Sequence, residues 1–241
     1  MSELTWITAD GVPYLTDTRA EQAGLRVAFT TRRGGRSGPP FDTLNLSDYV
    51  GDEAGAVADN RRTALAACGF EPDSLATLRQ VHGTDVIEVG RGACGSQGEA
   101  DALATGERGA TLGVLAADCV PVLLCGSRGV AAAHAGWRGL VAGVLDAAVA
   151  RVGADAAWVG PSIRACCYEV GGEVVTAFEG AGLPVEDERH VDPSWSAVVA
   201  LQRAGVAKVA SATECTSCDD RFFSFRRDGT TGRQAGLIAL L

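Results

Sequence analysis

The sequence predicts an α/β (α+β) fold in which mixed β-sheets are flanked by helices. Three short runs rich in Val, Leu and Ala lie close together at residues 112–117, 120–124 and 130–133, each bounded by Gly, Pro or polar residues. Such runs are typical of strands buried on both faces. Segments with helical spacing alternate with predicted strands without a single βαβ register, which favours mixed sheets with helices packed against them. With 241 residues and 46% hydrophobic content, the chain can bury the core of one domain, residues 1–241.

Further elements are predicted in chain order around this centre. Strands are expected at residues 24–31, 76–82, 84–89, 101–105, 156–160 and 206–213. Helices are expected at residues 53–68, at 140–153, from about residue 172, and at 194–206. The Gly-rich polar stretch 90–100 predicts a mobile loop or lid, and residues 222–241 predict two strands around a Gly-rich turn.

Charge and composition exclude several classes of protein. The formal net charge is −9 and Lys208 is the only lysine, so a surface that neutralises nucleic-acid phosphates is not expected. No apolar run approaches the ~18 residues of a membrane span, and the N-terminus lacks the pattern of a signal peptide. We therefore expect a cytoplasmic protein that binds neither nucleic acid nor membranes, with its eight cysteines reduced.

Polar residues at the ends of the central apolar runs predict a site. Asp118 and Cys119 follow the first run, and His134 follows the third. Together with His82, which lies between two predicted strands, Cys119 and His134 form a usual catalytic zinc set of two imidazoles and a thiolate. Zinc would lower the pKa of a bound water to about 7. Asp118 is then expected to orient a histidine or to carry protons.

Two other interpretations of these residues stay open. Cys119 could act as a nucleophile with His134 as its base. Alternatively, the residues form a buried cysteine and two structural histidines without catalytic function.

Two segments predict anion binding. Arg32 lies beside Gly34-Gly35, whose backbone N–H groups are free to form an anion cradle, although solvated arginines in an ordinary loop explain the pattern equally. Gly136 and Arg138 lie where a strand turns into a helix, which favours a phosphate or carboxylate there.

Cys215 and Cys218 have the spacing of a metal knuckle. A structural zinc ion needs a second pair of ligands, and the sequence offers none nearby, so no zinc is expected at this pair.

The motifs identify a family resemblance that spans almost the whole chain. The motifs are TTRRGG at 30–35, LNL at 44–46, QVHG at 80–83, ADCVPVLL at 117–124, AHAGWRG at 133–139, GPSI at 160–163, and FFSFRRDG with TGR at 222–233. In this order they resemble the YfiH-like laccase-domain family, whose members have been called multicopper polyphenol oxidoreductases and purine nucleoside phosphorylases. The resemblance implies a single-domain α/β/β/α sandwich of mixed sheets. It also implies that His82, Cys119 and His134 bind the metal and that Arg32 is the arginine of the TTR-x-GG loop.

The activity that the resemblance implies is phosphorolysis of adenosine, inosine or methylthioadenosine, giving the base and ribose 1-phosphate. It further implies zinc-dependent deamination of adenosine, and we hypothesise that Asp118 moves protons in this reaction. Zinc is the expected cofactor, copper is possible, and the expected partners are a purine nucleoside and phosphate.

Three alternatives remain. One is an editing hydrolase acting on a peptidoglycan precursor, and another is a non-catalytic protein that binds nucleosides. The third is a copper-dependent polyphenol oxidase (laccase), but a four-copper centre is built largely from imidazoles and the chain has three histidines.

Overall fold

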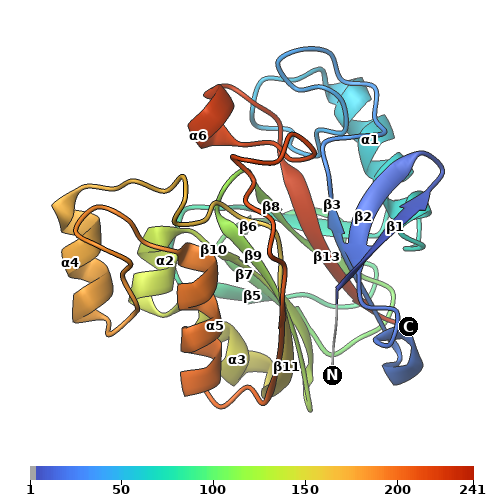
Figure 1. Cartoon of the computed structure of the whole chain (residues 1–241). Helices are drawn as coiled ribbons and strands as arrows, with labels where there is room; N and C mark the ends of the chain where they lie inside the picture. Colours follow the sequence, from blue (N-terminus) through green and yellow to red (C-terminus); the bar gives the residue numbers. More distant parts are fainter. Residues whose placement is uncertain (1–3) are drawn as a thin grey trace.

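The computed structural model describes residues 4–241, which form two mixed β-sheets (Figure 1). The first sheet has seven strands in the order β1 (Thr5–Ala9), β2 (Val12–Thr16), β3 (Leu25–Thr30), β13 (Gln234–Leu240), β8 (Thr111–Ala116), β4 (Leu75–Arg79) and β6 (Gly95–Glu99). The second has six strands in the order β12 (Lys208–Ser211), β11 (Ala154–Val159), β9 (Val120–Gly126), β10 (Gly129–Ala135), β7 (Ala102–Thr105) and β5 (Val86–Glu88). Both sheets are mixed, because β4 runs parallel to β6 and β8, and β11 runs parallel to β12.

Helices cover the outer face of each sheet (Figure 1). The helix α1 (Ala54–Ala67) packs on the first sheet. Four helices belong to the apolar cluster of the second sheet: α2 (Trp137–Ala142), α3 (Val144–Val152), α4 (Gly172–Gly180) and α5 (Pro193–Arg203). The short elements η1 (Glu21–Ala23) and α6 (Phe225–Asp228) lie in connections. The predicted α/β/β/α sandwich with mixed sheets is therefore confirmed.

The apolar layer between the sheets draws on both of them. Phe29 and Leu112 from the first sheet cluster there with Leu103 and Leu123 from the second, all four nearly or fully buried. Because the two sheets share this layer, neither can bury its inner face alone, which supports our proposal that the chain forms one domain.

Several predicted elements have the expected bounds. The prediction of a helix at residues 53–68 is confirmed as α1, whose N-cap Glu53 accepts hydrogen bonds from the backbone N–H groups of Gly55 and Ala56. The three central apolar runs form β8, β9 and β10 as expected.

Three local predictions are wrong. Residues 90–100 are not wholly a loop, since Gly95–Glu99 forms the edge strand β6 through backbone pairing with β4. The predicted helix at 140–153 is interrupted at Gly143, whose φ of 95° ends α2 before α3 begins. The segment 222–233 contains no strand, because Ser224 caps the short helix α6 by accepting a hydrogen bond from Arg227 N.

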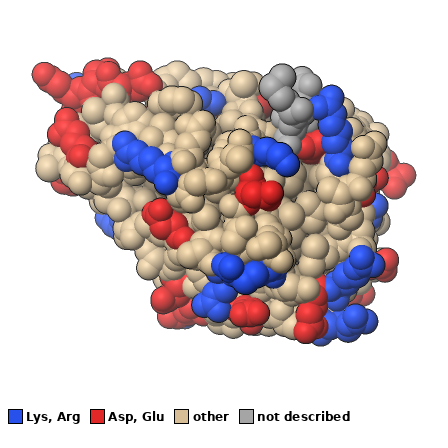
Figure 2. All heavy atoms as spheres, turned by 90° about the horizontal axis from the view of Figure 1, so that it is seen from below, with Lys and Arg blue, Asp and Glu red and all other residues tan. Residues whose placement is uncertain are grey.

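The described surface carries both signs of charge. Basic and acidic side chains lie interspersed over the face seen from below, so the described part of that face presents no continuous basic area (Figure 2). Among the helices formed by residues 4–241, none combines the length and apolar composition that crossing a membrane requires.

Candidate metal centre and pocket

The β9–β10 hairpin brings Cys119 and His134 together. Gly126 pairs with Gly129 across a two-residue turn, and the antiparallel register then places Pro121 opposite His134. Cys119 lies in the bend directly before β9, two residues from Pro121, and its Sγ lies within 4.8 Å of a ring nitrogen of His134. The hairpin therefore brings the backbone segments of Cys119 and His134 together.

His82 reaches the same place from the loop between β4 and β5, and Asp101 holds it there. His82 has a φ of 61°, which is uncommon for a residue other than glycine. The fully buried Asp101 carboxylate accepts hydrogen bonds from three successive backbone N–H groups, of Val81 (3.1 Å), His82 (3.0 Å) and Gly83 (2.6 Å). These bonds stabilise the unusual backbone and fix the direction of the imidazole.

Asp101 also fixes the second histidine. Its Oδ1 lies 2.8 Å from His134 Nδ1, so His134 directs Nε2 toward Cys119. Burial alone would raise the pKa of Asp101, but hydrogen bonds from His134, Gly83 and Val81 overcome this effect and lower it. Asp101 was not predicted from the sequence to lie at the site. The sequence feature that could have pointed to it is its position, a carboxylate at the start of a predicted buried strand.

The three donor atoms form a compact group. The Sγ of Cys119 lies 3.8 Å from Nε2 of His82, and one donor atom from each of His82, Cys119 and His134 lies within 4.8 Å of the others. The rings of the two histidines meet edge to face, with centroids 4.9 Å apart. Two imidazole nitrogens and a thiolate at this separation fit a tetrahedral zinc site that leaves one position for water or substrate.

Cys119 and His134 influence each other's ionisation. Burial opposes ionisation of Cys119, but the adjacent imidazoles, chiefly that of His134, outweigh burial and lower the pKa of the thiol to about 6. Burial likewise opposes charge on His134, while the Cys119 thiolate and the Asp101 carboxylate raise its pKa to about 9. The residues therefore form a thiolate–imidazolium pair near neutral pH when no metal is bound.

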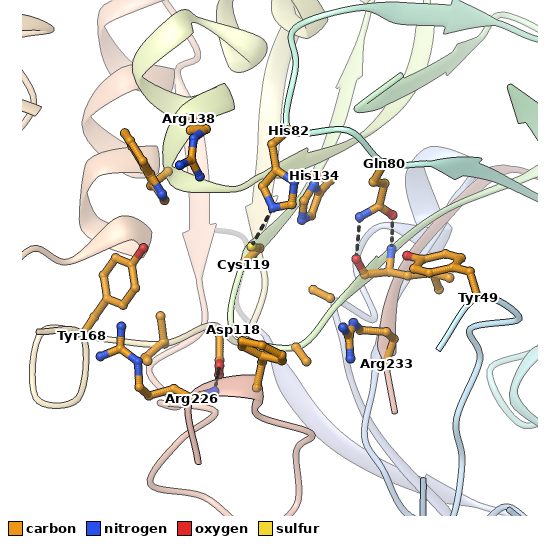
Figure 3. A pocket seen from close by; sticks show the side chains of 16 residues that line it. Tyr49, Gln80, His82, Asp118, Cys119, His134, Arg138, Tyr168, Arg226 and Arg233 are labelled. Atoms are coloured by element: carbon orange, nitrogen blue, oxygen red, sulfur yellow. Dashed lines mark hydrogen bonds between the residues drawn. The ribbon is translucent and has the colours of Figure 1, made fainter. Parts of the chain in front are cut away.

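A cavity of about 480 Å³ opens beside this group (Figure 3). Its polar and charged lining residues are Gln80, His82, Asp118, Cys119, His134, Arg138, Arg226 and Arg233. Its aromatic lining residues are Tyr49, Trp137, Tyr168 and Phe225. A volume of this size suits a small organic ligand.

The comparisons with known proteins identify the family. The sequence profile described as "Multi-copper polyphenol oxidoreductase laccase" matches residues 26–241. The chain belongs to this family. The resemblance expected from the motifs is thereby confirmed.

Relatives of this laccase family, and a solved structure, align with this chain over nearly its whole length. A protein of Escherichia coli (strain K12) named "Purine nucleoside phosphorylase YfiH" is 40% identical over 232 residues, which cover 90% of this chain and 95% of that protein. "Purine nucleoside phosphorylase SCO2081" of Streptomyces coelicolor is 43% identical over 238 residues, covering 90% of this chain and 96% of that protein. The crystal structure of YlmD from Geobacillus stearothermophilus superposes with a TM-score of 0.88 at 32% identity and covers 100% of this chain and 99% of that one.

In this member of the laccase family, the two arginines expected to bind an anion, Arg32 and Arg138, lie in surroundings that differ from each other. Arg32 does not line the cavity, since its guanidinium lies 3.1 Å from Asp42 Oδ2 and 3.6 Å from Asp228 Oδ2. Arg138 does line it and stacks over Trp137 with its guanidinium carbon 4.3 Å from the ring centroid. The structure thus supports a ligand-binding position for Arg138 and gives Arg32 a structural ion pair.

Two further cavity arginines, Arg226 and Arg233, were not predicted. Within the described part of the chain, each guanidinium donates to backbone carbonyls alone, of Cys167 and Glu169 for Arg226 and of Thr231 and Gly232 for Arg233. Both belong to the FFSFRRDG and TGR motifs of the laccase family.

Gly136 has a steric role. A Cβ at this position would lie 2.4 Å from His82 Cδ2 and 3.4 Å from Cys119 Sγ, so only glycine leaves room for the donor group. Gly136 precedes the six-residue helix α2, and so short a helix adds little dipole to bind an anion.

Asp118 does not orient a histidine. With a φ of 91°, it directs Oδ1 to the hydroxyl of Thr216 (2.7 Å) and Oδ2 to the backbone N–H of Arg226 (2.7 Å), as Figure 3 shows for the second contact. The orienting carboxylate is that of Asp101. Proton transfer remains a proposed role for Asp118, because this residue lines the cavity.

The third histidine lies elsewhere. His190 bonds with Asp187, 3.0 Å away, and does not line the cavity. The donor group therefore has two imidazoles, which suits one metal ion and falls far short of a four-copper centre.

The expectation that Cys215 and Cys218 lack a second pair of ligands is wrong. Cys166 and Cys167 lie beside them, and one sulfur from each of the four cysteines lies within 4.8 Å of the others. The fold joins segments about fifty residues apart, which spacing alone cannot show.

Proposed function

We propose that this chain is a purine nucleoside phosphorylase that cleaves adenosine, inosine or methylthioadenosine with phosphate. Relatives with 40% and 43% identity carry the name purine nucleoside phosphorylase. In the proposed reaction, a phosphate oxygen forms a bond to C1′ of the ribose while the bond from C1′ to the purine nitrogen breaks. The bonding electrons leave with the purine, which takes up a proton. The second product is ribose 1-phosphate from adenosine or inosine and 5-methylthioribose 1-phosphate from methylthioadenosine.

The charge distribution of the cavity is the observation that carries the proposal. Three arginines line the cavity, and within residues 4–241 no carboxylate lies within ion-pair distance of their guanidinium groups: Arg138, Arg226 and Arg233. By contrast, Arg32, Arg33 and Arg36 lie outside the cavity, and each forms an ion pair with an aspartate. Three unpaired arginines in a chain of net charge −9 make the cavity a local basic site. Phosphate is the substrate that would use them, since guanidinium groups bind its oxygens in pairs.

The aromatic lining suits the purine. Tyr49 and Phe225 are 50% and 59% exposed although both are large and apolar, and both border the cavity. Their rings offer faces on which a purine can stack.

Tyr168 offers a neutral hydrogen-bond donor inside the same cavity. Burial, reinforced by the negative charge of Cys119, raises the pKa of Tyr168 to about 12, so its phenol keeps its proton at neutral pH. A protonated phenol can donate to a purine nitrogen as negative charge develops on the departing base.

His82, Cys119 and His134 are proposed to hold zinc, for which their nitrogen and sulfur donors fit, and copper is an alternative occupant of the same donors. When bound, zinc would supply Lewis-acid activation for the hydrolytic deamination of adenosine. Asp118 would carry the protons that this reaction moves, and Asp101 would keep both histidines in position without contacting substrate.

Incubation of the purified protein with adenosine, with and without phosphate, tests the phosphorylase proposal. We expect adenine and ribose 1-phosphate to form only when phosphate is present. Arg138→Ala should raise the KM for phosphate about 10-fold or more, because a charge-assisted hydrogen bond contributes about 1.5–3 kcal/mol. Arg36→Ala, which breaks a surface ion pair with Asp59, is the matched control and should leave this KM unchanged. Release of free ribose, or cleavage that ignores phosphate, would contradict the proposal.

Formation of inosine from adenosine without phosphate tests the deaminase proposal separately. Asp118→Asn should reduce inosine formation by about 100-fold, in the usual range for loss of an acid–base group. Full inosine formation by this variant would remove the proton-carrying role.

A further inference from the structure

A second group of potential metal ligands lies outside the cavity. Cys166 and Cys167 belong to the loop between β11 and α4, and Cys215 and Cys218 belong to the turn after β12. All four cysteines are free, and the four sulfurs lie within 4.8 Å of one another. The proposed phosphorylase and deaminase reactions use none of them.

The separations of the sulfurs fit a tetrahedral ion. The Sγ of Cys218 lies 3.6 Å from that of Cys166 and 3.2 Å from that of Cys167. In a tetrahedron with metal–sulfur bonds of about 2.3 Å, neighbouring sulfurs are roughly 3.8 Å apart. A disulfide would need about 2.0 Å between two of these atoms and would leave the other two sulfurs unused.

An arginine side chain contacts the first cysteine loop. Of the four cysteines, Cys215 is buried, and Cys166 and Cys218 are exposed. The guanidinium of Arg226 lies against the first cysteine loop through the carbonyls of Cys167 and Glu169, 3.0 Å from each.

A second arginine lies on the other cysteine segment. Arg227 Nη1 donates to the carbonyl of Thr216 at 2.9 Å. Because the Arg227 guanidinium is ion-paired with Asp228 at 2.8 Å, Arg226 is the arginine that offsets part of the net charge of about −2 that four thiolates and a divalent cation carry.

We propose that Cys166, Cys167, Cys215 and Cys218 form a structural zinc site. A closed set of four thiolates is typical of structural zinc, because it leaves no coordination position for substrate. The sulfurs release their protons when the ion binds, and zinc undergoes no change of oxidation state.

The site joins two segments that form one wall of the cavity. Ser162 and Cys215 form an isolated β-bridge, and Thr216 N donates to Ser162 O at 3.0 Å. Tyr168, directly after Cys167, lines the cavity, and Thr216, directly after Cys215, donates to Asp118. Zinc would therefore stabilise the positions of Tyr168 and Asp118 without contacting substrate.

Metal analysis of the protein purified from zinc-containing medium tests the site. We expect about two zinc ions per chain, falling to about one in Cys119→Ala and to about one in the double variant Cys166→Ser/Cys218→Ser. Cys94→Ser, which changes an exposed cysteine outside both groups, is the matched control and should retain the wild-type content. Unchanged zinc in the double variant, or no zinc in Cys119→Ala, would overturn the proposal.

A second measurement covers the case in which the double variant does not fold. Cys119→Ala reconstituted with Co²⁺ should show the intense visible and charge-transfer bands of a tetrahedral four-thiolate complex. A spectrum of nitrogen and oxygen ligands alone, or a Cys167–Cys218 disulfide found by mass spectrometry of the freshly purified protein, would contradict the site. These outcomes do not depend on phosphorolysis, so either proposal can fail alone.

Discussion

Asp101 supports two ligands at once although it lies outside the donor group. One oxygen accepts from His82 N and His134 Nδ1, and the other accepts from Val81 N and Gly83 N. In Asp101→Asn, an NH₂ group would face two N–H donors in either orientation of the amide. We therefore expect the affinity of the His82–Cys119–His134 group for zinc to fall by about 10–100-fold.

Chelator competition measures this affinity. Asp101→Asn should be introduced into the Cys166→Ser/Cys218→Ser variant, so that the measured zinc affinity is that of the His82–Cys119–His134 group alone. Asp155→Asn on the exposed surface serves as the control. An unaltered zinc affinity in Asp101→Asn would show that the buried carboxylate does not position the histidines.

The acidity of Cys119 predicts its reactivity in metal-free protein. Because the adjacent imidazoles overcome burial and lower its pKa to about 6 from the ordinary value of 9.0, the reactive thiolate predominates above pH 6. The rate of alkylation of Cys119 by iodoacetamide should therefore be constant from pH 7 to 8 and fall by half near pH 6, as mass spectrometry of the modified peptide can measure.

The His134→Gln variant provides the comparison for this experiment. Removing the imidazolium partner should move the midpoint of the Cys119 alkylation profile to higher pH, and added zinc should protect the wild-type thiol. A wild-type midpoint near pH 9 would contradict the thiolate–imidazolium pair.

At the residue scale, the sequence predicted some of the residues that lie at the cavity and its donor group, and it missed others. Cys119, His134 and Arg138 were predicted, and each lines the cavity. Arg226 and Asp101 were missed. The sequence shows that a residue is an arginine or an aspartate, but it does not show which groups will lie within hydrogen-bond distance of its side chain in the folded protein. Likewise, the sequence does not show that Asp42 and Asp228 lie within ion-pair distance of the Arg32 guanidinium.

At the scale of elements, the interruption between α2 and α3 gives a sharp prediction. Gly143 has a φ of 95°, where a side chain is strained. Gly143→Ala should therefore lower the free energy of unfolding by about 1–2 kcal/mol in urea titration. Gly180→Ala in α4, where a Cβ meets nothing within 4 Å, should not destabilise the protein and is the control.

The sequence did not predict the structure of two segments that depend on tertiary hydrogen bonds. The strand β6 (Gly95–Glu99) is almost entirely exposed and has no apolar alternation. The sequence predicts a strand at Phe222 and Phe223 because both are apolar. In the structure both are buried, and the Gln234 side chain takes the place of a strand partner by bonding to Phe223 N and O. In both segments, tertiary contacts decide the local structure.

At the scale of the whole molecule, the central position of β9 predicts how burial stabilises the sandwich. Leu123 faces the layer between the sheets and Leu124 faces the helices, and both are fully buried. Leu123→Ala and Leu124→Ala should each cost about 2–5 kcal/mol of unfolding free energy. Ile7→Ala on the edge strand β1, where the side chain is half-buried, should cost distinctly less than either.

Thermal and urea denaturation measure all three variants. A small effect of either leucine variant would contradict a strand buried on both faces. This architecture was predictable, because continuous apolar runs in three neighbouring segments leave few other ways to exclude water.

The two-residue turn of the β9–β10 hairpin has a consequence for how this protein can vary in evolution. Its register, counted from Gly126 and Gly129, places Pro121 opposite His134 and so fixes the offset between His134 and Cys119, which lies two residues before Pro121. Loss of a single residue between Val120 and Gly126 would rotate one ligand away from the other, whereas extra residues inserted between Ser127 and Arg128 would leave the offset intact. Homologues that keep the donor group should therefore differ in length at the tip of this hairpin and never along its arms.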